Sequence, residues 1–273
     1  RRSFLAAAGL TAAALALTAC GGSASSTASS TASSAASSEA ASTSAAAELT
    51  TVEAGKLTMA TNAAFPPYEM TTDAGEFEGI DIDTAKAIAE KLGLELQIDD
   101  MDFDAALLSV QQGKADIVMA GVTVTDERKA VMDFSDSYAT GIQSIIVPEG
   151  SDITSPDDLA GKKIGTQRGT TGYIYCSDDF GDDAVVAYDD GLTAVQALNN
   201  GQVDAVVIDN APAKEFVAAN PGLVILDTSY AEEDYAIGLA KGSALEDAVN
   251  AALEELKADG TLQSIVDKYI TAE

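Results

Sequence analysis

One arginine in this sequence stands where a small carboxylate could bind. Residues 117–120 form a short apolar run that predicts a buried strand, and Gly121 ends it. Thr125 then fits the N-cap of a helix with two acidic residues in its first turn, so Arg128 lies one turn into that helix. Ligands of open α/β sheets bind beyond the carboxyl ends of the strands, and a guanidinium donates two parallel hydrogen bonds to a carboxylate. The alternative is a surface arginine paired with a nearby acid, and position alone leaves both open.

A second strand end carries a negative charge in a matching place. Residues 111–118 resemble residues 199–206, because in both a helix ends at glycine and a strand follows at once. The first strand leads toward Arg128 and the second to Asp209. If each series forms its own lobe, these two charges face each other across a cleft and match the two ends of a zwitterion. Chance recurrence of a helix–glycine–strand unit is the alternative.

The elements that must position these side chains alternate between strands and helices. Strands are expected at 57–61, 94–98, 117–120, 142–147, 163–166, 184–188, 203–208, 223–226 and 235–239, and helices at 244–258 and 262–269 close the chain. We expect Asp81 or Asp83 to cap a helix that ends at Gly93, and residues 62–69 to form a loop around a proline pair. This alternation predicts βαβ units and an α/β fold.

Composition narrows the classes of function. The chain has 273 residues with 47% hydrophobic residues, enough for a sizeable core, and a net charge of -29. That charge argues against nucleic-acid binding, which needs clustered Lys and Arg. The sequence contains no His, the commonest acid–base catalyst and metal ligand, and its acidic residues form no obvious catalytic pair or metal-ligand spacing. We therefore expect no catalytic residue, no metal and no cofactor.

The N-terminal residues predict export and a lipid anchor. Residues 1–20 combine a charged start, an apolar Ala-rich run and a Leu-Thr-Ala-Cys motif ending at Cys20, which resembles the lipobox of bacterial lipoproteins. Residues 21–50 consist almost entirely of Gly, Ala, Ser and Thr and are typical of a flexible tether. We expect an extracytoplasmic globule held to the cell membrane by lipidation of Cys20, with a chance cysteine as the alternative. The segment 1–5 resembles a twin-arginine motif, so Sec and twin-arginine export both stay open.

Four segments, taken in order, resemble the family 3 type of solute-binding proteins of amino-acid ABC importers. They are residues 60–69, 79–83, 120–128 and 133–135, and the resemblance covers roughly residues 57–269. It implies an α/β, two-lobe periplasmic-binding-protein fold of type II, in which each lobe is a mixed sheet flanked by helices and two hinge strands join the lobes. The solute-binding module would be 51–273, with lobe 1 about 55–137 plus 236–273 and lobe 2 about 143–230.

The resemblance also assigns roles toward the two ends of an amino acid. Arg128 would clamp the α-carboxylate, helped by backbone N–H groups at Thr123 and Thr171. Asp209 and the Gly121 carbonyl would accept hydrogen bonds from the α-ammonium group.

Other residues would meet the ligand side chain. Phe65 and Phe103 would sandwich it, with ordinary core packing as their alternative, and Asn62 and Gln167 would line its pocket. Ala120 and Thr170 complete the expected site. Arg168 lies beside the pocket loop and could face an acidic ligand; we expect it to point to water. Cys176 has no expected disulfide partner.

The resemblance implies a monomeric, membrane-tethered protein that captures a free L-amino acid and delivers it to the permease subunits of an ABC importer. Family members that bind glutamine or cationic amino acids often carry Asp where this chain has Asn62, and a buried cation wants a charged acceptor. A neutral polar ligand is therefore expected. The alternatives are a prephenate/arogenate-type dehydratase on the same fold and a ligand sensor without transport.

Overall fold

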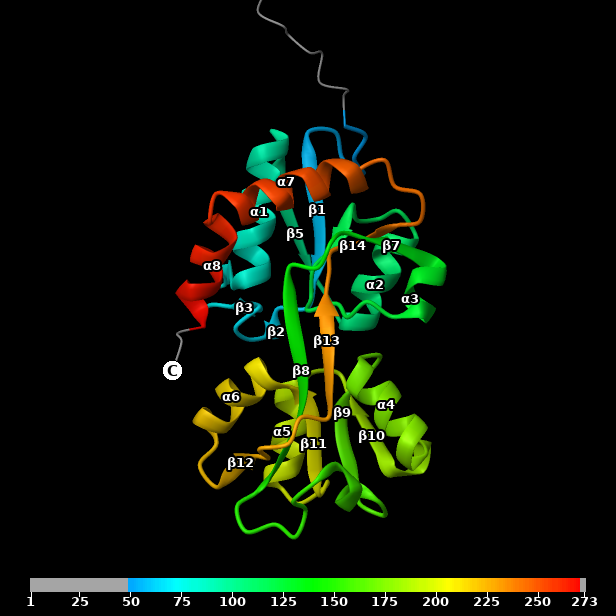
Figure 1. Ribbon diagram of the computed structural model, residues 1–273, viewed down its shortest axis with the longest axis vertical. Helices are drawn as coiled ribbons and strands as arrows, with labels where there is room; N and C mark the ends of the chain where they lie inside the picture. Colours follow the sequence, from blue (N-terminus) through cyan, green and yellow to red (C-terminus); the bar gives the residue numbers. More distant parts are fainter. Residues whose placement is uncertain (1–48, 271–273) are drawn as a thin grey trace, which may run out of the picture. The chain divides into compact units, whose positions relative to one another are not determined.

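The computed structural model describes residues 49–270. The expectations for Cys20, for the signal peptide at 1–20 and for most of the tether at 21–50 therefore lie outside the described residues. The described strands form two larger sheets with flanking helices and one small sheet, and two strands run between the larger sheets (Figure 1). None of the described helices has the length and apolar character that a bilayer crossing requires.

The first lobe is built on a five-stranded mixed sheet in the order β5-β1-β6-β14-β7. The central strand β1 runs parallel to β5 and β6, whereas β14 runs antiparallel to β6 and β7. Its consecutive residues Met59 and Ala60 are fully buried in clusters on opposite faces of the sheet, as the alternation along a strand requires. The strands are β1 (Lys56–Thr61), β5 (Glu95–Asp100), β6 (Ile117–Val118), β7 (Met132–Phe134) and β14 (Gly238–Ala240).

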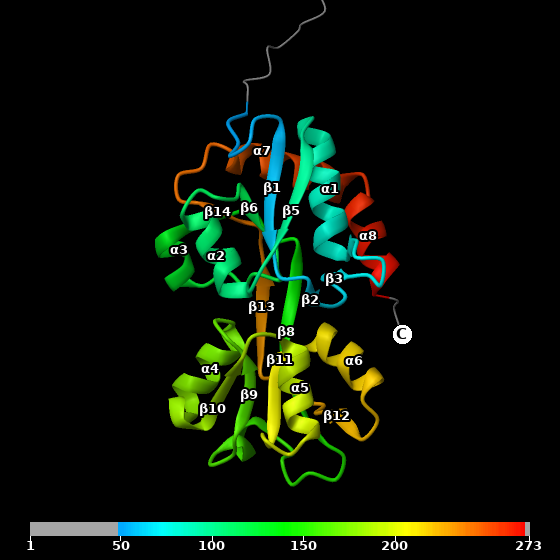
Figure 2. The ribbon, with the colours of Figure 1, turned by 180° about the vertical axis from the view of Figure 1, so that it is seen from behind.

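Helices cover both faces of this sheet, and Figure 2 shows α1 and α2 flanking β1 and β5. The helices are α1 (Ile80–Leu92), α2 (Phe103–Gln111), α3 (Asp126–Val131), α7 (Glu246–Ala258) and α8 (Thr261–Tyr269). A small antiparallel sheet of β2 (Ala64–Phe65), β3 (Glu69–Thr71) and β4 (Phe77–Glu78) adjoins the lobe.

The second lobe repeats this plan with the strand order β10-β9-β11-β8-β12. The neighbours Val206 and Val207 of β11 are buried on opposite faces of the sheet, and the buried, free Cys176 packs on the same side as Val207. The strands are β8 (Ala139–Pro148), β9 (Ile164–Gln167), β10 (Val185–Tyr188), β11 (Ala205–Asp209) and β12 (Leu223–Ile225). The helices are α4 (Thr171–Phe180), α5 (Gly191–Asn199) and α6 (Asn210–Ala219), with two 3-10 turns, η1 (Pro156–Leu159) and η2 (Asp182–Ala184).

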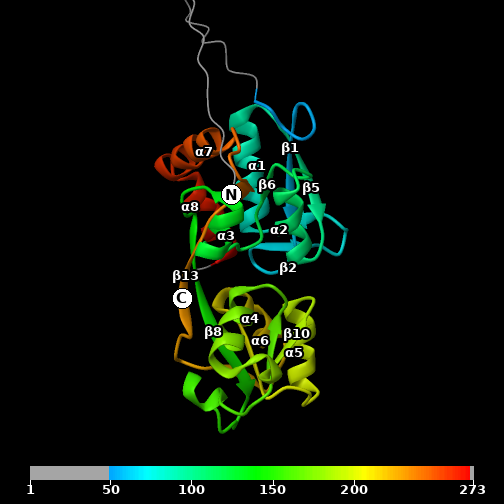
Figure 3. The same cartoon turned by 90° about the vertical axis from the view of Figure 1, so that its right-hand side faces the viewer.

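Two antiparallel strands connect the lobes. β8 pairs with β13 (Ala231–Tyr235) from Ala139 opposite Tyr235 to Gln143 opposite Ala231. Figure 3 shows both strands along one edge of the two lobes. At the first lobe, Tyr235 also bridges to Thr123, so this connection ends directly beside the Gly121 turn.

The repeated sequence unit is a repeated structural unit, one in each lobe. Both α2 and α5 end in a glycine with positive φ, 66° at Gly113 and 67° at Gly201. The aspartate that follows accepts a 2.8 Å hydrogen bond from a backbone N–H of the neighbouring strand segment, Asp116 from Thr58 and Asp204 from Lys163. The same local pattern thus sets the start of β6 and of β11.

Three expectations about the elements are wrong. The apolar run 235–239 is not one strand, because β13 ends at Tyr235 and β14 begins at Gly238. Since Ala236 and Ile237 between them are fully buried, hydrophobicity gives no sign of the break. The helix α1 begins at Ile80 after Gly79, so neither aspartate caps it. The expected loop 62–69 also contains β2 and the first residue of β3.

Candidate ligand site

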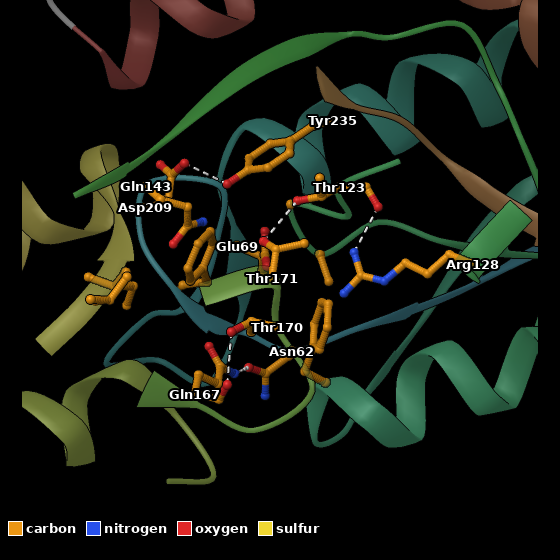
Figure 4. Close-up of a pocket in the computed structure, with 16 residues that line it drawn as sticks. Asn62, Glu69, Thr123, Arg128, Gln143, Gln167, Thr170, Thr171, Asp209 and Tyr235 are labelled. Carbon is orange, nitrogen blue, oxygen red and sulfur yellow. Dashed lines mark hydrogen bonds between the residues drawn. The ribbon is translucent and has the colours of Figure 1, made fainter. Parts of the chain in front are cut away.

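A pocket lies where the lobes meet, beside the two connecting strands. It brings together every side chain that the sequence assigned to the site (Figure 4). These are Asn62, Phe65, Phe103, Ala120, Gly121, Thr123, Arg128, Gln167, Thr170, Thr171 and Asp209. Glu69, Gln143, Val207, Ile208 and Tyr235 also line it.

Arg128 enters the pocket from the first lobe. Thr125 caps α3 as expected, and its hydroxyl accepts a hydrogen bond from the Arg128 N–H. The guanidinium donates from Nη1 to the Thr123 carbonyl at 2.7 Å and lies 5.3 Å from the centre of the Phe103 ring. Arg128 is only 8% exposed, and none of the ion pairs within residues 49–270 includes it. The alternative of a surface arginine paired with an acid is therefore wrong.

Asp209 enters from the second lobe, at the end of β11, where it also caps α6. Its Oδ1 accepts from the Ala211 N–H at 3.0 Å, and its Oδ2 accepts from the Ile142 N–H at 2.8 Å and the Tyr235 hydroxyl at 2.7 Å. A carboxylate offers about four acceptor positions, so one remains for a ligand donor. Burial raises the pKa of Asp209 to about 6, against the effect of these three donors.

The turn at Gly121 brings backbone groups up to the pocket. Its φ of 54° is the left-handed conformation that favours glycine. A Cβ there would lie 3.0 Å from Phe65 and 3.2 Å from Tyr235, so the main chain occupies space that a side chain would need. The Gly121 N–H donates to Asp81 Oδ2 at 3.0 Å. Asp81, which was expected at a helix cap, instead fixes this turn from within the first lobe.

Neutral amides meet across the pocket at another point. Gln167 Nε2 donates to Asn62 Oδ1 at 2.8 Å (Figure 4). Asn62 Nδ2 donates to the Met101 carbonyl at 3.0 Å. Gln167 belongs to the second lobe and Asn62 to the first, so this bond joins the lobes. The exposed Arg168 does not line the pocket and pairs with the exposed Asp189, in agreement with the expectation that it points to water.

Other contacts also cross between the lobes. Arg128 Nη2 donates to the Gly169 carbonyl at 3.1 Å, and the Thr123 and Thr171 hydroxyls lie 3.5 Å apart. The Gly169 backbone packs directly on the Asp104 side chain, where no Cβ would fit. The pocket is therefore closed over by hydrogen bonds and packing between groups that come from both lobes.

Sequence reasoning missed the residues that the connecting strands contribute. Glu233 of β13 is buried and accepts from Thr123 Oγ1 at 3.1 Å and from Gln143 Nε2 at 3.0 Å. Tyr235 lies edge-on to Tyr68 and bonds to Asp209. Two hinge strands were expected from the family resemblance, but no strand was predicted over 231–235, because Glu232, Glu233 and Asp234 in succession give no apolar alternation.

The described residues offer no candidate metal site, since no group of three or more Cys, Asp or Glu side chains among them could hold an ion. What the pocket offers is a cation and an anion, each with hydrogen-bonding capacity to spare, and a set of hydroxyls and amides between them.

Comparison with known proteins agrees with this geometry. Residues 57–272 match the family described as "Bacterial extracellular solute-binding proteins, family 3". The "Probable histidine-binding protein" of Neisseria gonorrhoeae is 33% identical over 275 residues, which cover 98% of this chain and 95% of that protein.

Two solved structures extend the comparison. The arginine-, lysine-, histidine-binding protein ArtJ of Geobacillus stearothermophilus is 34% identical, with a TM-score of 0.77 over 80% of this chain and 96% of that one. An ancestral arginine-binding protein bound to glutamine is 43% identical, with a TM-score of 0.76 over 80% of this chain and 99% of that one. Such neighbours are type II periplasmic binding proteins, as the sheets here also indicate.

Proposed function

This chain belongs to the bacterial extracellular solute-binding proteins of family 3, and from that premise we propose that it captures a neutral polar L-amino acid between its lobes and delivers it to the permease subunits of an ABC importer. One observation carries the proposal: Arg128 and Asp209, of opposite charge, face one pocket from opposite lobes. A zwitterion between them would bond to both lobes and favour the closed arrangement by its contacts to each.

The roles of the pocket residues follow from their free bonding capacity. Arg128 binds the α-carboxylate with the guanidinium N–H groups that its two carbonyl partners leave free. Asp209 and the Gly121 carbonyl receive the α-ammonium group. Thr123 and Thr171 support the carboxylate with backbone N–H groups, and that of Thr171 lies at the N-terminus of α4.

The amide pair supports a neutral polar side chain. Asn62 and Gln167 already bond to each other, and a ligand amide or hydroxyl can join such a pair without bringing a charge. The carboxyl groups that line the pocket are Asp209, assigned to the ammonium group, and the fully buried Glu69, whose pKa burial raises well above its usual value. A cationic side chain beside Asn62 would therefore lack an ionised partner. Among the related proteins, one is named for binding arginine, lysine and histidine, and an ancestral arginine-binding protein is described as bound to glutamine.

A thermal-shift screen of the purified protein against the twenty amino acids, cystine and ornithine tests the proposal. We expect neutral polar L-amino acids such as glutamine to raise the melting temperature most, because a ligand that binds only the folded state stabilises it. Shifts with arginine and lysine but none with glutamine would contradict the selectivity. No shift with any amino acid, together with conversion of prephenate or arogenate, would contradict the function.

The proposed location is outside the cytoplasm, as a monomer anchored through lipidated Cys20. The support is the Leu-Thr-Ala-Cys motif and the Ser/Ala-rich residues that follow it. Cys20→Ala is expected to release the protein into the medium, as measured by fractionation. Membrane retention of a fully processed Cys20→Ala protein would contradict the anchor.

A further inference from the structure

Two buried carboxyl groups face each other behind the Gly121 turn. Glu69 begins β3 and Asp81 lies in the first turn of α1, and both residues are 0% exposed. The Asp81 backbone N–H donates to the carbonyl of Tyr68, the residue before Glu69, at 2.9 Å, so the two acidic residues lie side by side. Asp81 Oδ2 accepts from the Gly121 N–H, whereas Asp81 Oδ1 and both oxygens of Glu69 have no donor among the described residues. Neither residue takes part in an ion pair within 49–270.

Two ionised carboxylates in contact inside a protein core are strongly unfavourable, because each loses its hydration and each repels the other. One proton shared between them removes the repulsion. A protonated oxygen of Glu69 then donates to Asp81 Oδ1, and Asp81 Oδ2 accepts from the Gly121 N–H. Only the second oxygen of Glu69 then lacks a partner.

The surroundings favour the proton on Glu69. Burial raises the pKa of Glu69 well above its usual value, and the charge of Asp81 raises it further. Burial raises the pKa of Asp81 only to about 6, because the Gly121 N–H favours its charged form. The other groups that face the pair are all acids or phenols, namely Tyr68, Tyr138 and Asp100. None of them supplies a positive charge that could replace the proton.

We propose that Glu69 and Asp81 share one proton and act as positioning residues, in which the protonated Glu69 donates to Asp81 and the ionised Asp81 holds the Gly121 main chain at the ligand pocket. This inference rests on the proposed function, because the ligand's ammonium group is what the Gly121 carbonyl receives. The turn has little freedom to adjust, since Phe65 and Tyr235 already pack within 3.0 and 3.2 Å of where a Gly121 Cβ would be.

The competing role for Glu69 is direct contact with the ligand. Glu69 also lines the pocket, so an ionised Glu69 could bind a ligand ammonium group itself. The two roles require opposite protonation states. They also respond differently to glutamine at position 69, because an amide N–H can donate to Asp81 as the protonated acid does but cannot pair with a cation.

Carboxyl ¹³C NMR of the ligand-free protein reads the proton directly. We expect Glu69 to remain protonated at pH 7 and the Gly121 amide signal to move at the pH where the pair loses its proton. An ionised Glu69 at pH 7, or a Gly121 amide that does not follow the pair, would overturn the inference. These two spectra need no variant, so they decide the matter even if a variant fails to fold.

Calorimetry with the amino acid that gives the largest thermal shift then tests positioning. Glu69→Leu should lose affinity on the order of tenfold or more, because buried Asp81 is left without its donor. Glu69→Gln should recover most of that loss and should lack the wild-type fall in affinity as rising pH removes the proton. Glu78→Leu, an exposed acid on the adjacent strand β4, is the matched control and should bind as wild type.

Wild-type affinity in Glu69→Leu would overturn the positioning role. A Glu69→Gln variant that binds as weakly as Glu69→Leu would also overturn it, because it would indicate that an ionised Glu69 pairs directly with the ligand. Failure of the wild-type protein to bind any amino acid would instead contradict the proposed function. The two failures are distinguishable because the carboxyl spectrum is recorded without ligand.

Discussion

The hydroxyl of Tyr235 donates a 2.7 Å hydrogen bond to Oδ2 of Asp209, which ties the last residue of a connecting strand to a carboxylate of the second lobe (Figure 4). Gly141 on the partner strand packs against both groups, since a Cβ there would lie 2.5 Å from Tyr235 Cζ and 2.6 Å from Asp209 Oδ2. The position of the Asp209 carboxylate in the pocket therefore depends on the geometry of the two connecting strands.

Tyr235→Phe removes one of the three donors to Asp209 and leaves the ring packing in place. We expect a loss of affinity of a fewfold to about tenfold, the size of one hydrogen bond to a charged group. The pKa of Asp209 should rise further, because the Tyr235 hydroxyl lowers it in the wild type. Calorimetry across pH measures both effects. Tyr230→Phe, which removes a hydroxyl bonded to Asp179 outside the pocket, is the control. Unchanged affinity and an unchanged pH profile in Tyr235→Phe would show that this bond does not support the site.

Gly141→Ala should disable binding without unfolding the protein. The added methyl group would meet both Tyr235 and Asp209 at distances that real Cβ atoms do not tolerate, so the carboxylate has to move. We expect a loss of at least about thirtyfold, comparable with loss of a buried charged partner. Calorimetry measures it, with circular dichroism for folding and the exposed neighbour Thr140→Ala as control. Binding at wild-type strength in a folded Gly141→Ala protein would mean that Asp209 has another acceptable position.

Ligand affinity and ligand-free stability should depend on pH in opposite ways between about pH 4 and 6. The pKa values of Asp81 and Asp209 are raised to about 6, so the folded state binds more protons than the unfolded state in this range. Their contribution to ligand-free stability is thus present below about pH 4 and is lost as pH rises through about 6. Affinity should rise over the same interval, because an ammonium group binds the ionised Asp209.

Melting temperatures with and without ligand from pH 4 to 7.5 measure both trends. The stabilisation by ligand should grow toward neutral pH in the wild type. In Asp209→Asn, which cannot ionise at this position, the residual stabilisation should be small and nearly flat. A wild-type ligand effect that does not change between pH 4 and 7 would contradict the role of Asp209.

Asn62→Asp should shift selectivity toward cationic amino acids. A carboxylate beside Gln167 would give a buried ammonium or guanidinium the charged acceptor that Asn62 does not offer. We expect affinity for lysine, ornithine or arginine to rise on the order of tenfold or more relative to glutamine, as measured by calorimetry. Asn62→Ala is the control, because it removes the amide without adding charge. Equal changes for cationic and neutral ligands in Asn62→Asp would place the ligand side chain elsewhere.

The positions of Arg128 and Asp209 could be predicted from the sequence because both depend on local features, a helix cap and a strand end. Thr125 is a recognisable N-cap, so the direction of Arg128 could be derived from one turn of helix. The helix–glycine–strand unit recurs with the same hydrogen bond from a backbone N–H to an aspartate side chain, so Asp209 could be related to the end of β6.

What the sequence could not supply depends on contacts between distant segments. Asp81 has the position of a helix cap, and only the packing of Glu69 and Gly121 around α1 turns it inward. The break after Tyr235 separates two sheets within one continuous apolar run, and no periodicity distinguishes a residue buried in one sheet from a residue buried in the other. Both features come from tertiary structure, which overrides local pattern.

The most direct test of the proposed site is calorimetry of Arg128→Ala beside the wild type, with the amino acid that gives the largest thermal shift. Removing one partner of a buried charged pair costs on the order of 2–5 kcal/mol, which is roughly thirtyfold to several-thousandfold in affinity. We expect that loss in a protein that still folds by circular dichroism, and a similarly poor Arg128→Lys, because a point charge cannot reproduce the planar fork. Wild-type affinity in a folded Arg128→Ala protein would contradict the assignment of this arginine to the ligand carboxylate.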